Sequence, residues 1–576
     1  MNGSRKKVEI KREFESEDIK IPEYMPCGTV EAFRILDREL NKKKMGITPK
    51  ILLYGDPDID GLIAELIPEE YLKQLGYSTM YTLNGNRAHG FKLSDEQLEK
   101  LKGGLIIAVD FSILKEDFDR ILQAGVSLIN IDHHEIEIEK YTSKTDSFVF
   151  SKCGDAYGII LNNQYSFEPK EFKFLSGAGM VYYFMKYVSR KYEVPLYSDY
   201  AAMVGISLLS DIRELESQEA SKFLYYLYHL DSPYLKYLVW LVSGESNSSQ
   251  RFTPFGVPRI CRNFIDFTFS PVFNSMLRAN RGETAIDLLR GVEDVVYSMR
   301  SYDTILRFKE IQKKIIAAIL KRIKEDENQV GNFTRRYKNL IVASIPSTFE
   351  PVEGYDITNY VGVTCSQLKD EDKTGAIFVI DESNNMSIRG SVRGGMDGID
   401  YLSIFQRNGV PCAGHHNAFG ILPCDISKID FDKISADIEE AENKFKETNN
   451  ITRKVVEINN LSFFAAGSDK KNSQCSVFCT LNEYCRDNHR IYLKYTGSPD
   501  DVKQEKVSEK YIKYKINGIT VQCFDPTLPF EDSLISMYYE NGKYVKYILR
   551  PKFEYDHVMT IEELIEFHTK LFGSDE

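Results

Sequence analysis

The sequence predicts an α/β protein with two α/β units and a β-rich C-terminal part. Between residues 46 and 215, short apolar runs alternate with amphipathic stretches of helical period, which is typical of βαβ units around a mainly parallel sheet. A similar alternation returns between residues 340 and 446. From residue 454 onward, apolar and polar residues alternate strictly, as in 490–495 and 515–522, and this pattern is typical of half-buried strands.

Four apolar runs of the first unit are expected to form buried strands, because each is short and ends abruptly on an ionisable residue. They are residues 50–54, 104–109, 126–131 and 204–210. Amphipathic stretches predict the helices of this unit. The stretches are residues 62–76, 94–101 and 117–125, preceded by a helix over 29–41.

The remaining elements follow in order. Residues 285–328 predict one or two long helices, whose basic face we interpret as a solvated connector. In the second unit we expect strands over 340–343, 376–380 and 387–393, and a last helix over 432–448. These patterns predict an N-terminal extension, a first α/β domain, a helical segment and connector, a second α/β domain and a β-rich C-terminal domain, over residues 1–45, 46–225, 226–335, 336–450 and 451–576.

Composition narrows the class of protein. An apolar content of 43% and a charged content of 27% in 576 residues are ordinary for a globular chain of several domains. No apolar run approaches the ~20 residues that span a bilayer, and the N-terminus lacks the apolar core of a secretory signal. Ten cysteines without a disulfide-like framework favour the cytoplasm. The net charge of −12 argues against coating nucleic acid through the overall field, although it allows a local basic groove.

Carboxylates and imidazoles follow all four apolar runs of the first unit. They are Asp56, Asp58 and Asp60 after the first, Asp110 after the second, Asp132-His133-His134 after the third, and Asp211 after the fourth. Ligand sites in open α/β sheets lie at the carboxyl ends of strands. Aspartate and glycine are also common turn residues, but repetition at successive strand ends favours a site over turn chemistry. Because so many carboxylates would repel one another, the pattern predicts divalent cations between them.

These motifs resemble the DHH phosphoesterase superfamily, and within it the RecJ-type single-strand-specific exonucleases. Tyr54-Gly55-Asp56, continued by Asp58 and Asp60-Gly61, is similar to the first RecJ motif. Several later segments also match, namely Asn86-Arg87, Leu175-Ser176-Gly177-Ala178-Gly179 and Pro271-Val272-Phe273-Asn274-Ser275-Met276-Leu277-Arg278. Residues 336–450 resemble the accompanying DHHA1 domain through Gly390-Ser391-Val392-Arg393 and Gly414-His415. Departures from the family pattern around the Arg278 motif and at Ala413 indicate a divergent member and are compatible with a phage-encoded one.

The resemblance implies a site with two Mn²⁺ or Mg²⁺ ions. The implied ligands are Asp56, Asp58, Asp60, Asp110, His133 and Asp211. Asp110 would bridge the ions, His134 would contact the scissile phosphate or assist the leaving group, and Asp132 would orient a ligand histidine. The implied substrate-binding residues are Arg87, Asn274, Arg278, Arg393, Gly414 and His415. The C-terminal domain lies where RecJ relatives carry an OB-like domain.

The implied activity is exonucleolytic digestion of single-stranded DNA to mononucleotides, from the 5′ end as in RecJ relatives. Its expected partners are single-stranded nucleic acid, DNA rather than RNA, together with a single-strand-binding protein or a helicase. Two alternatives stay open. One is a phosphodiesterase for oligoribonucleotides or cyclic dinucleotides, and the other is an inactive replication or repair scaffold. A zinc site at Cys475, Cys479, Cys485 and His489 is disfavoured, because their spacing differs from that of zinc knuckles.

Overall fold

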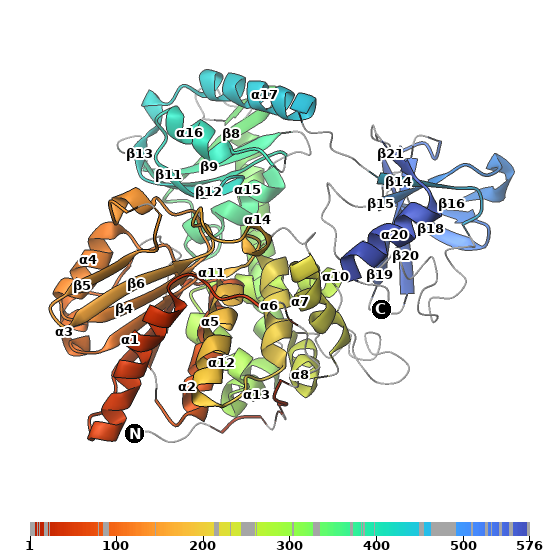
Figure 1. The fold of residues 1–576 in the computed structure, drawn as a ribbon. Coiled ribbons are helices and arrows are strands. Elements are labelled where there is room, and N and C mark those ends of the chain that lie inside the picture. The colour runs from red at the N-terminus through yellow and green to blue at the C-terminus, as the bar shows by residue number, and fades with distance from the viewer. Residues whose placement is uncertain are drawn as a thin grey trace.

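The structure is a computed structural model of the 576-residue chain. It describes residues 6–572 except 9, 11, 16–20, 22, 79, 84–90, 145, 212–217, 231, 243–259, 261, 302–303, 327–333, 369–372, 382, 384–385, 397, 449–453, 462–490, 509–510, 525–527, 532, 541–543 and 552–556. Three sheets succeed one another along this chain, and Figure 1 shows the third set apart from the other two. None of the described helices is both long and apolar enough to cross a membrane.

The first sheet has the strand order β2-β1-β3-β4-β6-β5. Its strands are β1 (Ile51–Gly55), β2 (Met80–Leu83), β3 (Leu105–Val109), β4 (Ser127–Asp132), β5 (Phe150–Cys153) and β6 (Ala156–Asn162). All neighbours are parallel except β5 and β6. This confirms the mainly parallel sheet, whose central strands are fully buried. The carboxyl ends of β1, β3 and β4 lie at the same edge of the sheet, because Gly55 pairs with Val109 and Val109 pairs with Ile131.

Helices cover both faces of this sheet. They are α1 (Thr29–Asn41), α2 (Ile59–Gln74), α3 (Asp95–Leu101), α4 (Lys115–Gln123) and α5 (Gly177–Tyr192). The apolar side chains of α1, α2 and α5 share one core, whereas those of α3 and α4 share another with the opposite sheet face. The predicted helices over 29–41 and 94–101 are confirmed, and Ser94 begins α3 with a capping box to Gln97.

One predicted strand of the first unit is wrong. Residues 204–210 are part of α6 (Asp199–Ser210), which is a helix buried on nearly all sides. A continuous apolar run is compatible with either a buried strand or a buried helix, so its composition could not decide between them. Asp211 therefore follows a helix end rather than a strand end.

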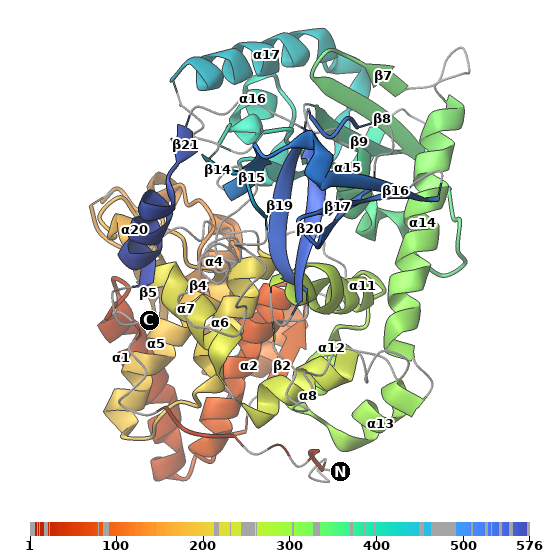
Figure 2. The ribbon, with the colours of Figure 1, turned by 90° about the vertical axis from the view of Figure 1, so that its right-hand side faces the viewer.

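A helical region joins the first sheet to the second. It comprises α7 (Gln218–His229), α8 (Pro233–Val242), α10 (Arg262–Phe264), a π-helical turn (Ile265–Phe269), α11 (Ser270–Arg278), α12 (Gly282–Arg290), α13 (Glu293–Ser301) and α14 (Thr304–Asp326). The stretch expected as one or two long helices thus contains three, and only α14 is long. Figure 2 shows α14 running from this region up to the second sheet.

The second sheet has the order β11-β12-β10-β9-β8-β7, with β13 paired to β10. Its elements are β7 (Thr334–Arg336), β8 (Leu340–Pro346), α15 (Val361–Leu368), β9 (Thr374–Asp381), β10 (Met386–Arg393), α16 (Tyr401–Arg407), β11 (Cys412–His415), β12 (Ala418–Ile421), β13 (Cys424–Asp425) and α17 (Phe431–Thr448). Only β8 and β9 are parallel. The hairpin of β11 and β12 reaches back toward the first sheet (Figure 1).

The third sheet has eight strands in the order β16-β17-β18-β20-β19-β15-β14-β21. They are β14 (Lys454–Ile458), β15 (Ile491–Tyr495), β16 (Val502–Ser508), β17 (Tyr511–Ile516), β18 (Ile519–Cys523), β19 (Ser533–Glu540), β20 (Tyr544–Pro551) and β21 (His557–Met559). This sheet confirms the β-rich C-terminal part. The last helix, α20 (Ile561–Phe572), contacts α7. The four residues weighed as a zinc site lie outside the described residues.

Candidate metal centre

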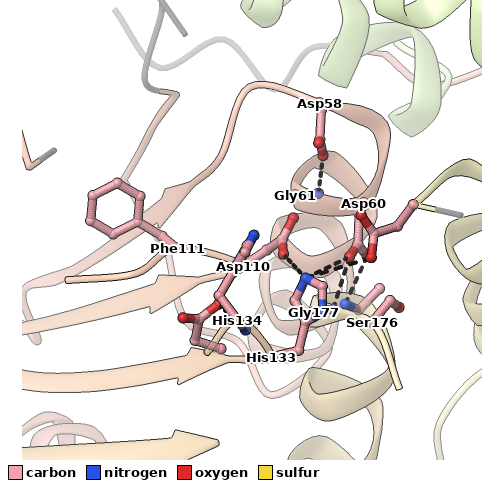
Figure 3. Close-up of polar contacts among 12 residues, drawn as sticks. Asp58, Asp60, Gly61, Asp110, Phe111, His133, His134, Ser176 and Gly177 are labelled. Atoms are coloured by element: carbon pink, nitrogen blue, oxygen red, sulfur yellow. Dashed lines mark hydrogen bonds and ion pairs between the residues drawn. The ribbon is translucent and has the colours of Figure 1, made fainter. Parts of the chain in front are cut away.

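The loop between β1 and α2 carries the first acidic motif. Asp58 caps α2, because its Oδ1 accepts a hydrogen bond from the Gly61 amide at 3.0 Å (Figure 3). Only glycine fits at position 61, since a β-carbon there would collide with the Asp56 carbonyl. The tight turn therefore holds all three aspartates of the motif at the carboxyl edge of the sheet.

Asp60 is buried and fixed by two other helices. Its carboxylate accepts hydrogen bonds from the Gly177 amide at 2.8 Å, from the Ala178 amide at 2.9 Å and from the Ser207 hydroxyl. The two amides belong to the first turn of α5, whose dipole favours a negative charge. Burial and the neighbouring carboxylate of Asp211 nevertheless raise the pKa of Asp60 to about 7.

Asp110 follows β3 in a left-handed backbone conformation, with φ of 53°. Aspartate tolerates this region better than most residues, but the conformation is still uncommon and is typical of functional sites. The side chain lies against the backbone of Gly177, where a β-carbon would sit 2.5 Å from Asp110 Oδ1. Burial, followed by the charges of Asp60 and Asp58, raises the pKa of Asp110 well above its ordinary value.

His133 follows β4 and points into this group of carboxylates. Its Nε2 lies 3.0 Å from Asp110 Oδ1 and 3.8 Å from Asp60 Oδ2 (Figure 3). The same nitrogen lies 3.7 Å from Asp211 Oδ2. The structure thus brings together Asp60, Asp110, His133 and Asp211. Asp56 and Asp58 lie in the adjoining β1–α2 loop, where the Asp58 carboxylate caps α2.

This donor set fits divalent cations. Burial and like charges oppose the ionisation of Asp60 and Asp110, and a cation bound between them would offset both effects. A mixture of carboxylate oxygens and one imidazole nitrogen suits Mn²⁺, and Mg²⁺ less specifically. The cluster could therefore hold metal ions.

His134 lies beside this cluster and is oriented by Asp132. The His134 Nδ1 lies 2.7 Å from Asp132 Oδ1, and the Asn162 side chain donates to the His134 carbonyl at 2.9 Å. The histidine that Asp132 contacts through its side chain is thus His134, rather than the expected ligand His133. Burial of the ring opposes its protonation, but the charge and hydrogen bond of Asp132, together with the charges of Asp211 and Asp56, raise the pKa of His134 to about 9.

The second sheet contributes His415 to the same place. His415 Nε2 lies 3.6 Å from Asp211 Oδ1, and its ring stacks on His134 with centroids 4.8 Å apart. Gly414 precedes it with φ of 139°, a conformation that favours glycine. The neighbouring His416 points elsewhere, to Glu135 Oε1 at 3.4 Å and Asp400 Oδ1 at 3.0 Å.

Two predicted arginines gather around the start of α15, in the second unit. Arg278 donates to Gln312 Oε1 at 2.7 Å, and its charge lowers the otherwise raised pKa of Tyr360. Arg393 donates to Ser391 Oγ at 2.7 Å, and its Nη2 lies 2.8 Å from where a β-carbon of Gly362 would be. Asn274 lies one turn before Arg278 on α11, and Arg87 lies outside the described residues.

Sequence reasoning missed the residues that support Asp60. The Ser176–Gly179 segment was expected only as a helix start, and Ser207 was expected in a strand. A signal did exist, since a serine cap followed by three small residues leaves amides accessible to a carboxylate. Which carboxylate they would meet depends on contacts about 117 residues away along the chain.

Residues 50–207 match the model of the DHH family, N-terminal domain. This part of the chain, which carries the first sheet and its acidic motifs, is therefore a DHH-family domain. Its fold is similar to that of RecJ from Thermus thermophilus in complex with Mn²⁺, with a TM-score of 0.59 and 16% identity over 94% of this chain and 74% of that chain. The Mg²⁺ complex of that RecJ matches with a TM-score of 0.57 and 16% identity, over 94% and 72%. At this identity the similarity shows a shared fold. No curated protein matches the sequence.

A methyl group at position 177 of this DHH protein should disturb the centre selectively. In Gly177→Ala the new β-carbon would lie 2.5 Å from Asp110 Oδ1 and 2.6 Å from Asp110 Cγ, so the carboxylate must move. We expect Mn²⁺ affinity to fall more than about tenfold, as for other changes that displace ligands. Calorimetric titration with Mn²⁺ measures this. The control is Gly179→Ala on the same helix, where the β-carbon meets the flexible end of Leu175. Unchanged Mn²⁺ affinity in Gly177→Ala would contradict the placement of Asp110.

Stabilisation by Mn²⁺ should grow with pH. The raised pKa values of Asp60 and Asp110 mean that the folded, metal-free protein retains protons that the unfolded chain releases near pH 4. These groups therefore cost stability progressively as the pH rises toward and past 7, and a cation relieves that cost by replacing the protons. Thermal unfolding with and without Mn²⁺ should show a larger increase in Tm at pH 8 than at pH 5.5. An equal increase at both pH values would argue against cations binding at these carboxylates.

Proposed function

We propose that this protein is a metal-dependent exonuclease that hydrolyses single-stranded DNA from the 5′ end and releases mononucleotides. The observation that carries the proposal is the convergence of Asp60, Asp110, His133 and Asp211, with His415 of the second sheet facing them. Two facts about similar structures support it, namely the RecJ fold and the Mn²⁺ and Mg²⁺ complexes of the Thermus RecJ.

The carboxylates and His133 would hold two divalent cations. By the family pattern, Asp58, Asp60, Asp110, His133 and Asp211 would hold these ions, and Asp110 would serve both of them. Asp56 would lie near the first ion. When bound, such cations neutralise the phosphate and lower the pKa of the attacking water. The hydrogen bonds from α5 to Asp60 fix the carboxylate in advance, which reduces the reorganisation that binding requires.

His134 would serve the leaving oxygen of the scissile bond. Its Nδ1 is engaged by Asp132, so Nε2 is the nitrogen left to face the substrate. Asp132 also favours the protonated ring, and a protonated imidazole can donate to a leaving oxygen. Asp132 is thus a positioning residue in this proposal, and His134 is the catalytic one.

Phosphate binding would fall to residues of the helical region and the second sheet. Arg278 and Arg393 both lie near the start of α15, where guanidinium groups and helix amides can hold phosphate oxygens. Asn274, Gly414 and His415 would contact the strand between this place and the cations, and Arg87 would add a further contact. Because most contacts would be to phosphate, affinity should depend strongly on salt and weakly on base sequence.

The third sheet favours a polymeric single strand over a dinucleotide. β16, β17 and β18 form an antiparallel meander, β18 runs parallel to β20, and β19 returns to β15. The order of these strands is similar to the Greek-key order of the five-stranded OB barrel, a fold that binds single-stranded nucleic acid. We therefore assign this part of the chain, within residues 451–576, as an OB-like strand-binding domain.

Digestion of a matched substrate set tests the proposal. With Mn²⁺, we expect rapid hydrolysis of a single-stranded DNA oligonucleotide labelled at either end, with 5′ nucleotides released first. Blunt duplex, RNA and a cyclic dinucleotide should react much more slowly. Preferential hydrolysis of the cyclic dinucleotide or of short RNA would establish the alternative phosphodiesterase. Mn²⁺ binding without hydrolysis of any substrate would favour the scaffold.

A further inference from the structure

Three imidazoles from two different sheets meet at one side of the centre. His133 and His134 follow β4 of the first sheet, and His415 ends β11 of the second. Ring centroids are 4.4 Å apart for His133 and His134, 4.8 Å for His134 and His415, and 5.7 Å for His133 and His415. One nitrogen of each ring lies within 4.8 Å of the corresponding nitrogens of the other two, so small side-chain rotations would bring them to a shared ion.

The hydrogen bond that Asp132 makes to His134 is one that supports metal-binding histidines. Asp132 binds Nδ1 of His134 at 2.7 Å and leaves Nε2 as the donor, and a carboxylate behind a histidine is the usual arrangement around metals. Asp211 lies between the two sheets, with Oδ2 at 3.7 Å from His133 Nε2 and Oδ1 at 3.6 Å from His415 Nε2. The three rings offer three nitrogens, and Asp211, which faces His133 and His415 through different oxygens, offers a carboxylate oxygen beside them.

This donor set differs in chemistry from the carboxylate cluster beside it. Three imidazoles and one carboxylate suit a four-coordinate Zn²⁺, whereas Mn²⁺ and Mg²⁺ prefer sites dominated by oxygen. Zn²⁺ also binds nitrogen donors more tightly than Mn²⁺ does. The histidine side of the centre should therefore discriminate strongly between the two metals.

We propose that His133, His134, His415 and Asp211 form an inhibitory site for Zn²⁺, which His415 closes from the second sheet. The inference rests on the proposed function, because it concerns the same centre. An ion held there ties the second sheet to the first. Because His133 and Asp211 would then bind Zn²⁺, they could not bind the second Mn²⁺. His134 and His415 likewise could not contact the phosphate. Zn²⁺ in excess is thus expected to compete with both Mn²⁺ and substrate.

Metal affinities of variants test this without using activity. Zn²⁺ affinity is measured by competition with a chromophoric chelator, and Mn²⁺ affinity is measured from the signal of free Mn²⁺ in electron paramagnetic resonance. In His415→Ala we expect Zn²⁺ affinity to fall by about 10- to 100-fold, with Mn²⁺ affinity within about threefold of the wild type. His416→Ala is the matched control, because its ring faces Glu135 and Asp400, and both affinities should be kept. His415→Asn serves as a second variant, and circular dichroism verifies the fold of each.

Two results would overturn the proposal. Wild-type Zn²⁺ affinity in both His415 variants would show that His415 is not a ligand. An equal loss of Zn²⁺ and Mn²⁺ affinity would show that His415 does not discriminate between the metals. Failure of the proposed function is distinguishable from either, because a wild-type protein that binds Mn²⁺ and Zn²⁺ as expected but hydrolyses no nucleic acid would refute only the exonuclease.

Discussion

Asp110→Asn should abolish hydrolysis without lowering the stability of the folded protein. Asp110 Oδ1 lies 3.0 Å from His133 Nε2, and burial followed by the charges of Asp60 and Asp58 raises the pKa of Asp110, so we expect this carboxylate to serve the proposed cations. Loss of a bridging ligand removes several kcal/mol of transition-state stabilisation, so we expect turnover to fall by about 10³-fold or more. Single-turnover rates with labelled single-stranded DNA and saturating Mn²⁺ measure the loss.

Asparagine is the informative replacement at this position. It keeps the size of aspartate and tolerates the left-handed backbone at φ of 53°, which alanine would adopt only with strain. The metal-free variant should unfold at a Tm equal to or above that of the wild type, because it removes a buried group whose ionised form is disfavoured in the folded state. A folded Asp110→Asn protein that hydrolyses DNA at the wild-type rate would refute the assigned centre.

The grouping of residues at the strand ends could be predicted from sequence alone, because a parallel sheet places the carboxyl ends of its strands at one edge. Asp56, Asp110 and Asp132 each follow or end a buried apolar run, and the level register of β1, β3 and β4 turns that sequence position into spatial proximity. No such rule governs Asp211. Its apolar run forms the buried helix α6, so the residue reaches the cluster through helix packing rather than strand order.

Contacts between distant segments were beyond sequence reasoning of this kind. The expected role of His415 came from a motif resemblance, whereas its stacking on His134 and its approach to Asp211 depend on how α14 and the β11–β12 hairpin place the second sheet. Local spacing contains no information on that placement. The same holds for Asp132, whose choice of His134 over His133 depends on side-chain rotamers at the end of β4.

The two adjacent histidines should separate into different roles. His133→Ala should lose metal, because its Nε2 lies within 3.8 Å of three carboxylates, whereas His134→Ala should retain metal and lose turnover. General acid catalysis contributes about 10²- to 10⁴-fold, which sets the expected loss in His134→Ala. Elemental analysis of both purified variants, together with single-turnover rates, measures the separation. Equal loss of Mn²⁺ in the two would show that both rings are ligands of the catalytic ions.

Asp132→Asn then distinguishes a catalytic His134 from a merely structural one. Asp132 raises the pKa of His134, so the protonated ring persists to higher pH in the wild type than it would without the carboxylate. Activity that needs protonated His134 falls as the pH rises through this pKa. In Asp132→Asn the alkaline limb of the pH–rate profile should therefore move to lower pH, with Mn²⁺ content kept. Ser112→Ala is the control, because the Ser112 hydroxyl also donates to Asp132 Oδ2, at 2.9 Å. This variant leaves the carboxylate charge in place, so the alkaline limb of its pH–rate profile should move much less. An alkaline limb at the same pH in Asp132→Asn and in the wild type would exclude His134 as the proton donor.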